Sequence, residues 1–459
     1  MELIDLILPQ GTYTSAERME VCTLQGEACL SLSMAPSLML HHAFNTLEKA
    51  SNMSLEALLA CIYKAGDIFV NDILAGQSPK GYVKQLHAIN GLAESVILES
   101  LHDISSFMKN ISNVIAEQKH SAGFEYSVQS THALNGTFHR KFGTIFTCIL
   151  PGNHPGVNTV WLNAMALGYK VLLKPSSSDP ITSYRLILSL QKAGMLDGQV
   201  SFIPGKREIN AQLVELSKEH RLMFFGGQDI VDTFGSKSGV IVRGPGYSKL
   251  WLEPAYYAKK PNDSIDSICR SIVADGGIKC TNLSQILVNT TEDGFVNSLH
   301  ASVNASLGAW FDVQLQSSNS QLCVYEIDRA KRILNYIATK LADSGQLNIN
   351  PLILLHDFED GTATIRPWVF KVTPGSIVDF EVPAPIALLQ SAQCESELRN
   401  SLSLSVLSND NDMFERLAQL NNIRKLLWCL PTTYSTSNLP HDGALYEQLF
   451  EKVGIARSN

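Results

Sequence analysis

A single thiol stands in the short segment Gly276-Gly277-Ile278-Lys279-Cys280-Thr281-Asn282, among glycine, basic and polar neighbours. The segment follows a run of helical character and precedes an apolar run that begins at Gln285. A thiolate is an effective nucleophile toward carbonyl carbon near neutral pH. Glycines let the backbone turn sharply, so a substrate carbonyl can approach the sulfur and the nearby peptide N–H groups. The segment predicts covalent catalysis on Cys280, and a loop cysteine without a chemical role is the alternative.

Three further polar segments have residue types that suit a dinucleotide. They are Pro-Gly-Asn-His-Pro-Gly at 151–156, Lys-Pro-Ser-Ser-Ser at 174–178, and Gly226-Gly227. The N–H groups of Gly226-Gly227, placed before an expected helix, predict a pyrophosphate site. Lys174 and the serines suit ribose hydroxyls or a phosphate on the ribose. The sequence has no G-x-G-x-x-G, so the usual Rossmann fingerprint is missing.

The elements that must position these segments alternate regularly between strands and helices. Such alternation predicts βαβ units and a parallel sheet, with the ligand crevice at the carboxyl ends of the strands. Each polar segment follows an expected strand, so all three are expected at one edge of the sheet. The expected strands are 143–150, 170–173, 200–203, 222–225 and 240–243, and the expected helices are 156–167, 181–193, 207–217 and 228–234.

The flanking regions complete the expected organisation. Apolar residues repeat at helical spacing from Ala35 to about Gln118,. Asn135-Gly136 predicts a two-residue hairpin turn between strands at 127–133 and 137–142,. From Trp251 onward a second α/β segment is expected, and the tail 437–459 is expected to be polar and then helical. In this second segment the expected helices are 264–273, 292–306, 328–342 and 411–420, and the expected strands are 285–288, 352–355, 369–372 and 425–430.

Length and composition limit the class of protein. A chain of 459 residues is expected to form two or three domains, and 45% hydrophobic with 17% charged residues is ordinary for a globular enzyme,. The formal net charge of −8 argues against a nucleic acid or an anionic membrane as partner,. Nine cysteines without CxxC or metal-type spacing predict neither a disulfide framework nor a metal site,. Because no signal peptide or membrane-length apolar run is present, we expect a soluble, cytoplasmic protein.

Taken in order, these segments resemble motifs of the aldehyde dehydrogenase superfamily. No single motif is specific, but six stand in the correct order over residues 142–386, with Cys280 correctly placed. Phe142–Ile145 with Pro151–Pro155 resembles the strand and "PWNFP" loop, Val171–Ser176 resembles "VVKPAE", Ala193–Leu196 with Phe202–Gly205 resembles "AGxP…NVVxG", Phe224–Gly227 resembles "FTGS", Leu252-Glu253 resembles "LELGG", and Glu381–Ile386 resembles "EIFGPV".

Several details resemble the acyl-thioester reductase branch of that superfamily. Lys174–Pro180 and Ser437–Gly443 are similar to segments of the fatty-acyl reductase of bacterial bioluminescence systems. Pro254-Ala255 stands where hydrolytic members carry two glycines after their glutamate. Glu253 and Cys280 are also close in sequence for the family.

The resemblance implies an α/β fold with a Rossmann-type cofactor domain, an α/β catalytic domain and a small oligomerisation hairpin. The corresponding boundaries are 1–250 for the helices and cofactor domain, with the hairpin at about 124–142, then 251–430 for the catalytic domain. Residues 431–459 are expected as a bridging tail. Family members usually pair through the hairpin and tail, so a homodimer or homotetramer is expected.

Residue roles also follow from the resemblance. Cys280 is the expected nucleophile, Asn153 joins the N–H of Cys280 in an oxyanion hole, and Glu253 matches the base of hydrolytic members. Ser177 stands where NAD-preferring members carry a glutamate, so NADP(H) is favoured and NAD(H) remains possible. The residues expected to bind the cofactor are Lys174, Ser176, Ser177, Phe225, Gly226, Gly227 and Glu381, and no metal is implied.

The expected reaction is reduction of an acyl thioester, carried on coenzyme A or a carrier protein, to an aldehyde. A hydrolytic aldehyde dehydrogenase, which oxidises an aldehyde to an acid, is the alternative. A non-catalytic scaffold subunit with the same fold is a second alternative. Retention of the cysteine, asparagine, lysine and both glutamates at matching places argues against the scaffold.

Overall fold

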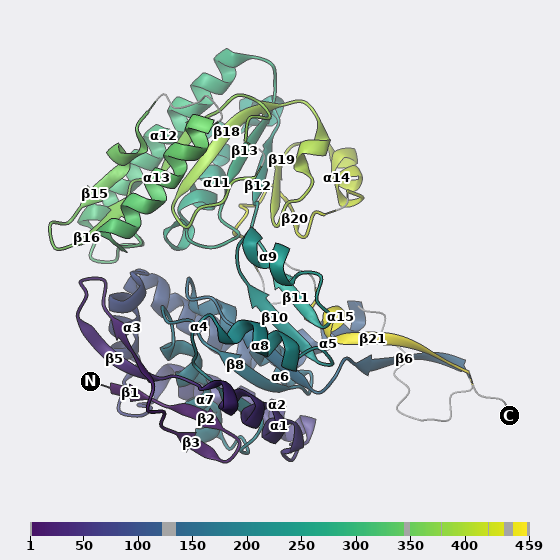
Figure 1. The fold of residues 1–459 in the computed structure, drawn as a ribbon. Coiled ribbons are helices and arrows are strands. Elements are labelled where there is room, and N and C mark those ends of the chain that lie inside the picture. Colours follow the sequence, from purple (N-terminus) through teal and green to yellow (C-terminus); the bar gives the residue numbers. More distant parts are fainter. Residues whose placement is uncertain are drawn as a thin grey trace. The chain divides into compact units, whose positions relative to one another are not determined.

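The chain, seen here as a computed structural model, is described over residues 2–121, 135–343, 349–377, 379–420, 422–435 and 444–456. It divides into two compact units (Figure 1). Unit 1 comprises residues 1–89, 97–244 and 444–459, and unit 2 comprises residues 90–96 and 245–443. The main division falls at 244/245, whereas the sequence analysis placed it after residue 250.

Unit 1 is organised around a seven-stranded sheet with the order β11-β10-β7-β8-β9-β2-β3. The five strands from β11 to β9 in this order are parallel and are the five predicted from the sequence. Their order reverses at β7, because β8 and β9 lie on one side of it and β10 and β11 on the other. Such a reversal opens a crevice at the carboxyl ends of the two strands that flank it. The strands are β2 (Leu6–Leu8), β3 (Gly11–Tyr13), β7 (Ile145–Ile149), β8 (Lys170–Lys174), β9 (Val200–Phe202), β10 (Arg221–Phe225) and β11 (Val240–Arg243).

Helices cover both faces of this sheet because its central strands carry apolar side chains on both sides. Every residue of β7 and β8 is buried. Ile145, Leu172 and Leu222 pack with α1 and α8 in one core cluster, while α6 contacts β7 and β8 and α2 packs on α7. The helices of unit 1 are α1 (Ser37–Lys49), α2 (Leu55–Asn71), α3 (Pro79–Asn90), α4 (Glu94–Lys109), α5 (Ile111–Ser121), α6 (Thr159–Ala166), α7 (Ile181–Ala193), α8 (Ile209–Leu216), α9 (Gln228–Phe234) and α15 (Leu445–Leu449).

The N-terminal segment forms strands that the sequence did not predict. β2 pairs antiparallel with β9, and β3 pairs antiparallel with β2, which extends the cofactor-type sheet. A separate sheet has the order β1-β5-β4, with β1 (Glu2–Ile4), β4 (Arg18–Cys22) and β5 (Ala28–Ser33). These short strands carry weak local signals, so their pairing partners decide their structure.

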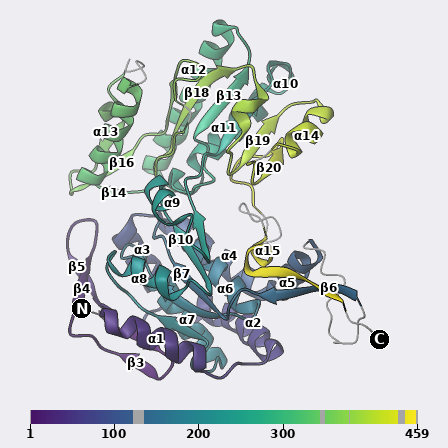
Figure 2. The ribbon, with the colours of Figure 1, turned by 45° about the vertical axis from the view of Figure 1, so that its right-hand side comes forward.

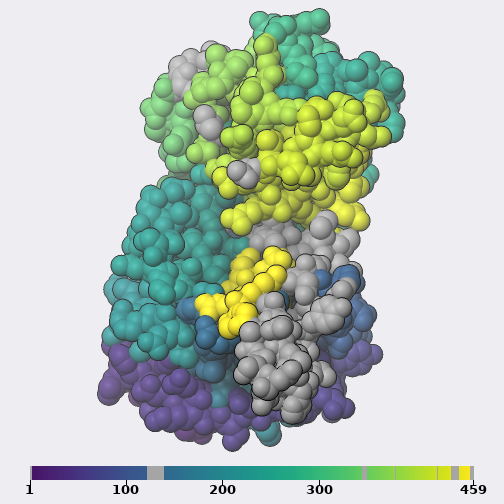
Figure 3. Space-filling view, turned by 90° about the vertical axis from the view of Figure 1, so that its right-hand side faces the viewer, coloured from purple at the N-terminus to yellow at the C-terminus, as the bar shows by residue number. Residues whose placement is uncertain are grey.

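The predicted hairpin turn at Asn135-Gly136 is wrong. Both residues belong to β6 (Asn135–Lys141), which pairs antiparallel with β21 (Phe450–Ala456) near the end of the chain. The two strands form a ribbon that runs out from the helices of unit 1 (Figure 1), and β21 is part of that unit's surface (Figure 3). The predicted first strand, 127–133, lies outside the described residues. Of the described part of the tail, residues 445–449 form the predicted helix and residues 450–456 form β21, where ladder bonds to β6 decide the structure,.

Unit 2 contains a six-stranded parallel sheet with the order β17-β18-β13-β12-β19-β20 (Figure 2). Alternate residues of a strand face opposite sides. Leu250 and Leu252 accordingly pack with α11 and α12, whereas Trp251 packs with α14 on the other face. The sheet strands are β12 (Lys249–Leu252), β13 (Gln285–Asn289), β17 (Trp368–Lys371), β18 (Ile386–Ala392), β19 (Leu404–Leu407) and β20 (Leu426–Trp428).

The helices at 261–273, 327–343 and 411–418 lie close to their predicted ranges, and the helix that starts at Asp293 runs ten residues past its predicted end. The sequence analysis did not predict the helix at 254–259, the strands at 325–326 and 362–365, or the sheet strands β12, β18 and β19. The predicted strand 352–355 is mostly a 3-10 helix, η4 (Pro351–Leu354), because the ring of Pro351 suits a first helical position and provides no N–H for a strand,. No described helix is both long and apolar enough to cross a membrane. The other elements are α10 (Pro254–Lys259), α11 (Pro261–Val273), α12 (Asp293–Gln316), α13 (Ile327–Asp343), α14 (Asn411–Ala418), β14 (Tyr325–Glu326), β15 (Leu355–Asp357) and β16 (Thr362–Ile365).

Candidate active site

The Cys280 loop, residues 274–282, joins the end of α11 to the start of β13 in unit 2. It begins with three successive residues at positive φ: Asp275 at 52°, Gly276 at 75° and Gly277 at 74°. At Gly277 a methyl group would lie 2.5 Å from Cα of Pro385, so the loop approaches that segment as closely as glycine allows. Asp275, whose left-handed conformation is strained for a residue other than glycine, forms an ion pair with Lys279,. The loop is thus tightly folded before the chain reaches the thiol.

Cys280 is partly exposed. Its backbone contacts the segment that precedes β12. Ser248 Oγ donates a hydrogen bond to Cys280 O at 2.9 Å. A methyl group at Gly246 would lie 2.6 Å from Cys280 Cβ and 2.2 Å from Cys280 O. Only glycine fits at that distance, so residues 246–248 pack directly against the backbone and Cβ of Cys280.

Glu381 contacts the same segment, residues 246–248. Its Oε2 accepts a hydrogen bond from Gly246 N at 2.7 Å. Burial raises the pKa of Glu381 to about 7, and the bond from Gly246 N partly offsets the rise,. Within unit 2 the structure therefore brings Glu381 and Cys280 to opposite sides of one glycine.

Glu253 lies elsewhere in unit 2. It directly follows β12, and its carboxylate accepts hydrogen bonds from Trp251 Nε1 at 2.6 Å and from Asn289 Nδ2 at 3.1 Å. Asn289 ends β13, whereas Cys280 precedes that strand and is bound by Ser248, just before β12. Because β12 and β13 are parallel, Glu253 lies at the carboxyl ends of these strands and Cys280 lies near their amino ends. The structure does not bring these two predicted residues together.

Asn153, in unit 1, stands in the loop that follows β7, at the reversal of strand order. The side chain is exposed. Its neighbour His154 caps the 3-10 helix η2 (Pro155–Asn158) by accepting a bond from Gly156 N at 3.1 Å, and its Nε2 lies 3.2 Å from Ser100 Oγ. His154 therefore has a structural explanation in the loop that carries Asn153.

The lysine and serines expected at the ribose lie together after β8. Lys174 is 9% exposed, and burial lowers the pKa of its ammonium to about 8, while the Glu208 carboxylate partly offsets this. Ser176 Oγ and Ser178 Oγ are 2.9 Å apart. A methyl group at Gly152 would reach within 2.0 Å of Ser178 Oγ, so the loop after β7 packs on this turn. Ser177 is exposed at the tip.

Phe225 ends β10, and Gly226 and Gly227 lie between this strand and α9. A methyl group at Gly226 would lie 2.4 Å from Ile230 Cγ1, so glycine lets the helix pack closely on the strand end. The first turn of α9 already carries the acidic Asp229, which pairs with Arg207 at 2.8 Å. That carboxylate competes with a bound phosphate for the positive end of the helix.

The predicted cofactor residues of unit 1 thus follow β8 and β10, at the carboxyl edge of one parallel sheet. A buried lysine, hydroxyls at a turn tip and two glycines suit the hydroxyls and phosphates of a dinucleotide. The residues present fit such a cofactor.

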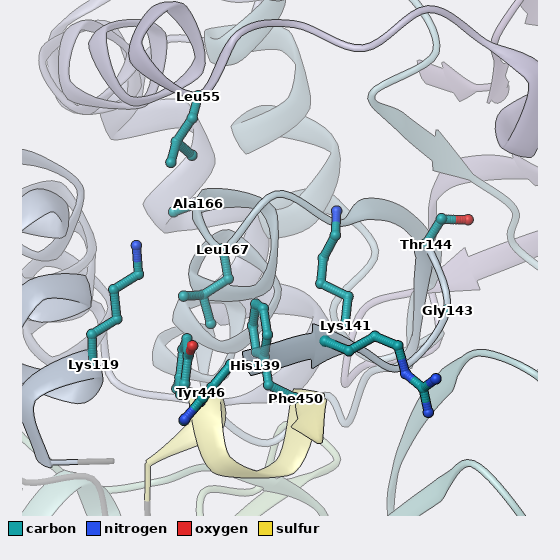
Figure 4. A pocket seen from close by; sticks show the side chains of 11 residues that line it. Leu55, Lys119, His139, Lys141, Gly143, Thr144, Ala166, Leu167, Tyr446 and Phe450 are labelled. Atoms are coloured by element: carbon teal, nitrogen blue, oxygen red, sulfur yellow. The ribbon is translucent and has the colours of Figure 1, made fainter. Parts of the chain in front are cut away.

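A separate pocket of about 540 Å³ lies in unit 1 near the start of the β6–β21 ribbon (Figure 4). Its wall includes the basic side chains Lys119, His139, Arg140 and Lys141 together with apolar groups such as Leu167. It contains none of the predicted site residues.

Sequence reasoning did not assign roles to Gly246, Ser248 or Asn282, which hold the Cys280 loop. The Gly-Pro-Gly run at 244–246, directly before an apolar strand, was the local signal for a close backbone approach,. Asn282 offered no comparable signal, because an asparagine near a loop end is usually a turn residue.

The chain resembles a known protein family and several solved structures. A model described as the aldehyde dehydrogenase family matches residues 86–419. The 1-pyrroline-5-carboxylate dehydrogenase of Staphylococcus haemolyticus (strain JCSC1435) is 29% identical over 168 residues, covering 34% of this chain and 32% of that protein. The protein of the same name from Staphylococcus aureus (strain JH1) is 32% identical over 166 residues, with the same coverage, 34% and 32%. The matched region spans only about a third of these relatives.

Solved structures resemble the whole chain. A salicylaldehyde dehydrogenase from Pseudomonas putida G7, complexed with salicylaldehyde, has a TM-score of 0.78 at 12% identity and covers 100% of this chain and 99% of its own. An indole-3-acetaldehyde dehydrogenase complexed with NAD+ has a TM-score of 0.75 at 14% identity, covering 98% and 96%. At these identities the likeness shows the fold alone. The family match spans most of the sequence, from the N-terminal helices to the last helix of unit 2, so the chain belongs to the aldehyde dehydrogenase family.

Proposed function

We propose that this protein reduces an acyl thioester, on coenzyme A or a carrier protein, to the aldehyde. The observation that carries the proposal is the separation of Glu253 from Cys280 within unit 2. Hydrolytic aldehyde oxidation needs a base that activates water beside the acyl-enzyme. The resemblance matches Glu253 to that base. Glu253 accepts hydrogen bonds from Trp251 and Asn289 at the opposite end of the strands from Cys280. Without that base the acyl-enzyme persists long enough to be reduced.

In the proposed reaction the Cys280 thiolate attacks the thioester carbonyl, and the carrier leaves as a thiol after taking up a proton. The acyl group is then bonded to Sγ. A bound nicotinamide cofactor would supply the hydride that reduces this group. The Cys280 Sγ–carbon bond finally breaks, which releases the aldehyde and restores the thiolate. We propose Asn153 and the N–H of Cys280 as donors to the oxyanion, where loss of one donor typically costs about 100- to 1,000-fold in rate.

For the cofactor we propose Lys174, Ser176 and Ser177 at the adenine ribose and Glu381 at the nicotinamide ribose. Phe225, Gly226 and Gly227 are proposed at the phosphates and adenine side. Ser177 carries no charge, so it does not repel a 2′-phosphate, and NADP(H) is the proposed preference. The carboxylate of Glu208 acts on the Lys174 ammonium. It would repel a 2′-phosphate bound there, so NAD(H) is the proposed second choice.

Oxidation of an aldehyde to an acid is the second candidate function. The curated relatives favour it, since they are named 1-pyrroline-5-carboxylate dehydrogenases. It would require a water-activating base other than Glu253.

We also propose a homodimer or homotetramer that assembles through the β6–β21 ribbon, in a reducing compartment such as the cytoplasm. All nine cysteines lie in the described residues and none of them forms a disulfide, which suits that compartment,. Light scattering on purified protein gives the oligomer size.

The test of function is the absorbance of NADPH and NADH on addition of acyl-coenzyme A thioesters of several chain lengths and of an acyl carrier protein. The reverse assay uses aldehyde and oxidised cofactor, with or without coenzyme A. Thioester-dependent oxidation of the reduced cofactor is expected. Acid formation from aldehyde without a thiol acceptor, and no thioester reduction, would favour the second candidate, whereas no turnover and no cofactor binding would favour a scaffold.

Intact-mass spectrometry tests the nucleophile. Cys280→Ala should abolish the acyl adduct and both directions of turnover, while cofactor affinity stays within about threefold of wild type because the cofactor groups lie on other residues. Cys148→Ala and Cys323→Ala are matched controls, because burial raises the pKa of Cys323 to about 11 and raises that of Cys148 further. An adduct on another cysteine refutes the assignment.

A further inference from the structure

Asn282, two residues after Cys280, is buried and bonded on both sides of its amide. It is 8% exposed. Its Oδ1 accepts a hydrogen bond from Lys279 N at 2.7 Å. Its Nδ2 donates to Ser271 O at 3.1 Å and to Ala274 O at 3.0 Å, at the end of α11. The side chain therefore ties the residue before the nucleophile to the helix that enters the loop.

The backbone of Asn282 closes the same turn. Asn282 N donates to Lys279 O at 3.0 Å, so residues 279–282 form a turn with Cys280 inside it. On the other side of the turn, Ser248 Oγ holds Cys280 O. Ser248 and Asn282 thus hold the turn that carries the thiol and its peptide N–H from two sides, and Asn282 makes the contact on the helix side.

We propose that Asn282 is a positioning residue for catalysis: its amide holds the turn at residues 279–282 so that Sγ and the N–H of Cys280 keep the geometry of attack. This inference rests on the proposed role of Cys280 as nucleophile. An amide is suited to the position because it accepts from one peptide N–H while donating to two carbonyls. Aspartate keeps the acceptor and loses the donors, and alanine loses both.

The effect should fall on the chemical step. Displacing a reacting group by about 1 Å can cost about 100-fold in rate, although binding groups elsewhere are untouched. Asn282→Ala is therefore expected to lower kcat by about 10- to 100-fold, with KM and the dissociation constant of NADPH changed by less than about threefold. Asn282→Asp should lower kcat at least as much as Asn282→Ala, because its buried carboxylate would face the carbonyl oxygens of Ser271 and Ala274,.

Asn304 provides a matched control in the same unit. It is also 8% exposed, and its amide links helix α12 to the backbone of one residue of β17, Val369. Its Oδ1 accepts from Val369 N at 2.9 Å and its Nδ2 donates to Val369 O at 3.1 Å. None of these bonds involves the Cys280 loop. Asn304→Ala should lower the melting temperature about as much as Asn282→Ala and leave kcat within about twofold of wild type.

The experiment measures kcat, KM, melting temperature, NADPH affinity and the rate of Cys280 alkylation by iodoacetamide for wild type, Asn282→Ala, Asn282→Asp and Asn304→Ala. Alkylation of Cys280 in Asn282→Ala should stay within about threefold of wild type, which shows that the thiol is intact while turnover is lost. Equal loss of kcat in the two alanine variants, or full kcat in Asn282→Ala, would overturn the inference. If Asn282→Ala does not fold, the same comparison is made with Asn282→Asp.

The outcome is separable from the proposed function. Thioester reduction and aldehyde oxidation both use the thiol, so the ratio of kcat values can be read in whichever reaction wild type performs. A fully active Cys280→Ala would refute the nucleophile, and with it the role of Asn282. An inactive Cys280→Ala together with a fully active Asn282→Ala would refute only the positioning role.

Discussion

Replacing Glu381 with glutamine should make the protein more stable at alkaline pH. The side chain keeps nearly the same shape, and its amide oxygen can still accept the hydrogen bond from Gly246 N that Glu381 accepts at 2.7 Å. What changes is the charge. Burial raises the pKa of Glu381 from 4.5 to about 7, so the folded protein holds the ionised carboxylate at a cost in free energy,.

The sign and size of the effect follow from proton linkage. Between pH 4.5 and 7 the folded state binds more protons at Glu381 than the unfolded state, so the free energy of unfolding falls as pH rises through this range,. The whole contribution of this group is present below pH 4.5 and is lost above pH 7. Each pKa unit corresponds to about 1.4 kcal/mol, so the full loss is up to about 3 kcal/mol. Glutamine does not titrate and avoids that loss.

The assay is urea unfolding of wild type and Glu381→Gln at several pH values from 5 to 8.5, followed by tryptophan fluorescence. Four of the five tryptophans, Trp251, Trp310, Trp368 and Trp428, belong to unit 2, so the signal reports mainly the unit that contains Glu381. The difference between the two proteins cancels every other titrating group. It should be small at pH 5 and approach about 3 kcal/mol in favour of glutamine at pH 8.5. Parallel stability curves across this range would refute the reasoning.

Three further predictions test other parts of the structure. Glu253→Gln should leave thioester reduction within about tenfold of wild type, and a loss of about 100- to 10,000-fold in steady-state turnover would instead identify Glu253 as a general base. Because the pKa of Lys174 is lowered to about 8, its ammonium deprotonates above that pH, and NADPH affinity by fluorescence titration should fall more steeply than NADH affinity between pH 7 and 9.5. Lys174→Met should remove the difference between the pH dependences of NADPH and NADH affinity. A wild-type preference for NADH of more than about tenfold in kcat/KM, or about 1.4 kcal/mol, would contradict the proposed cofactor. Deleting residues 444–459 removes β21 and leaves β6 without its strand partner. Calorimetry should then show a lower melting temperature, and light scattering should show that the proposed dimer or tetramer is lost. An unchanged protein would mean that the ribbon supports neither unit 1 nor the assembly.

The amino-acid sequence by itself determined the elements whose signals are local. Helices α7 and α9 and strand β11 have the bounds predicted from apolar periodicity and from the turn residues around them. Continuous apolar runs predicted parallel strands covered on both faces, and all five predicted strands of the cofactor-type sheet are present. The Cys280 loop was also visible, because two glycines before a thiol permit positive φ and a sharp turn. Such features depend on residues that are near neighbours in the chain.

Only the tertiary structure decided which distant segments meet. Residues 450–456 of the tail form a strand because β6, more than 300 residues earlier, has backbone groups that pair with them. Glu253 and Cys280 are close in sequence, yet the parallel register of β12 and β13 separates them across the length of a strand. The Gly-Pro-Gly run at 244–246 signalled a close approach, but only the fold shows that Gly246 lies against Cys280, more than 30 residues later. Strand pairing and close approach depend on backbone groups brought together by the whole core, and a local sequence signal carries little information about them.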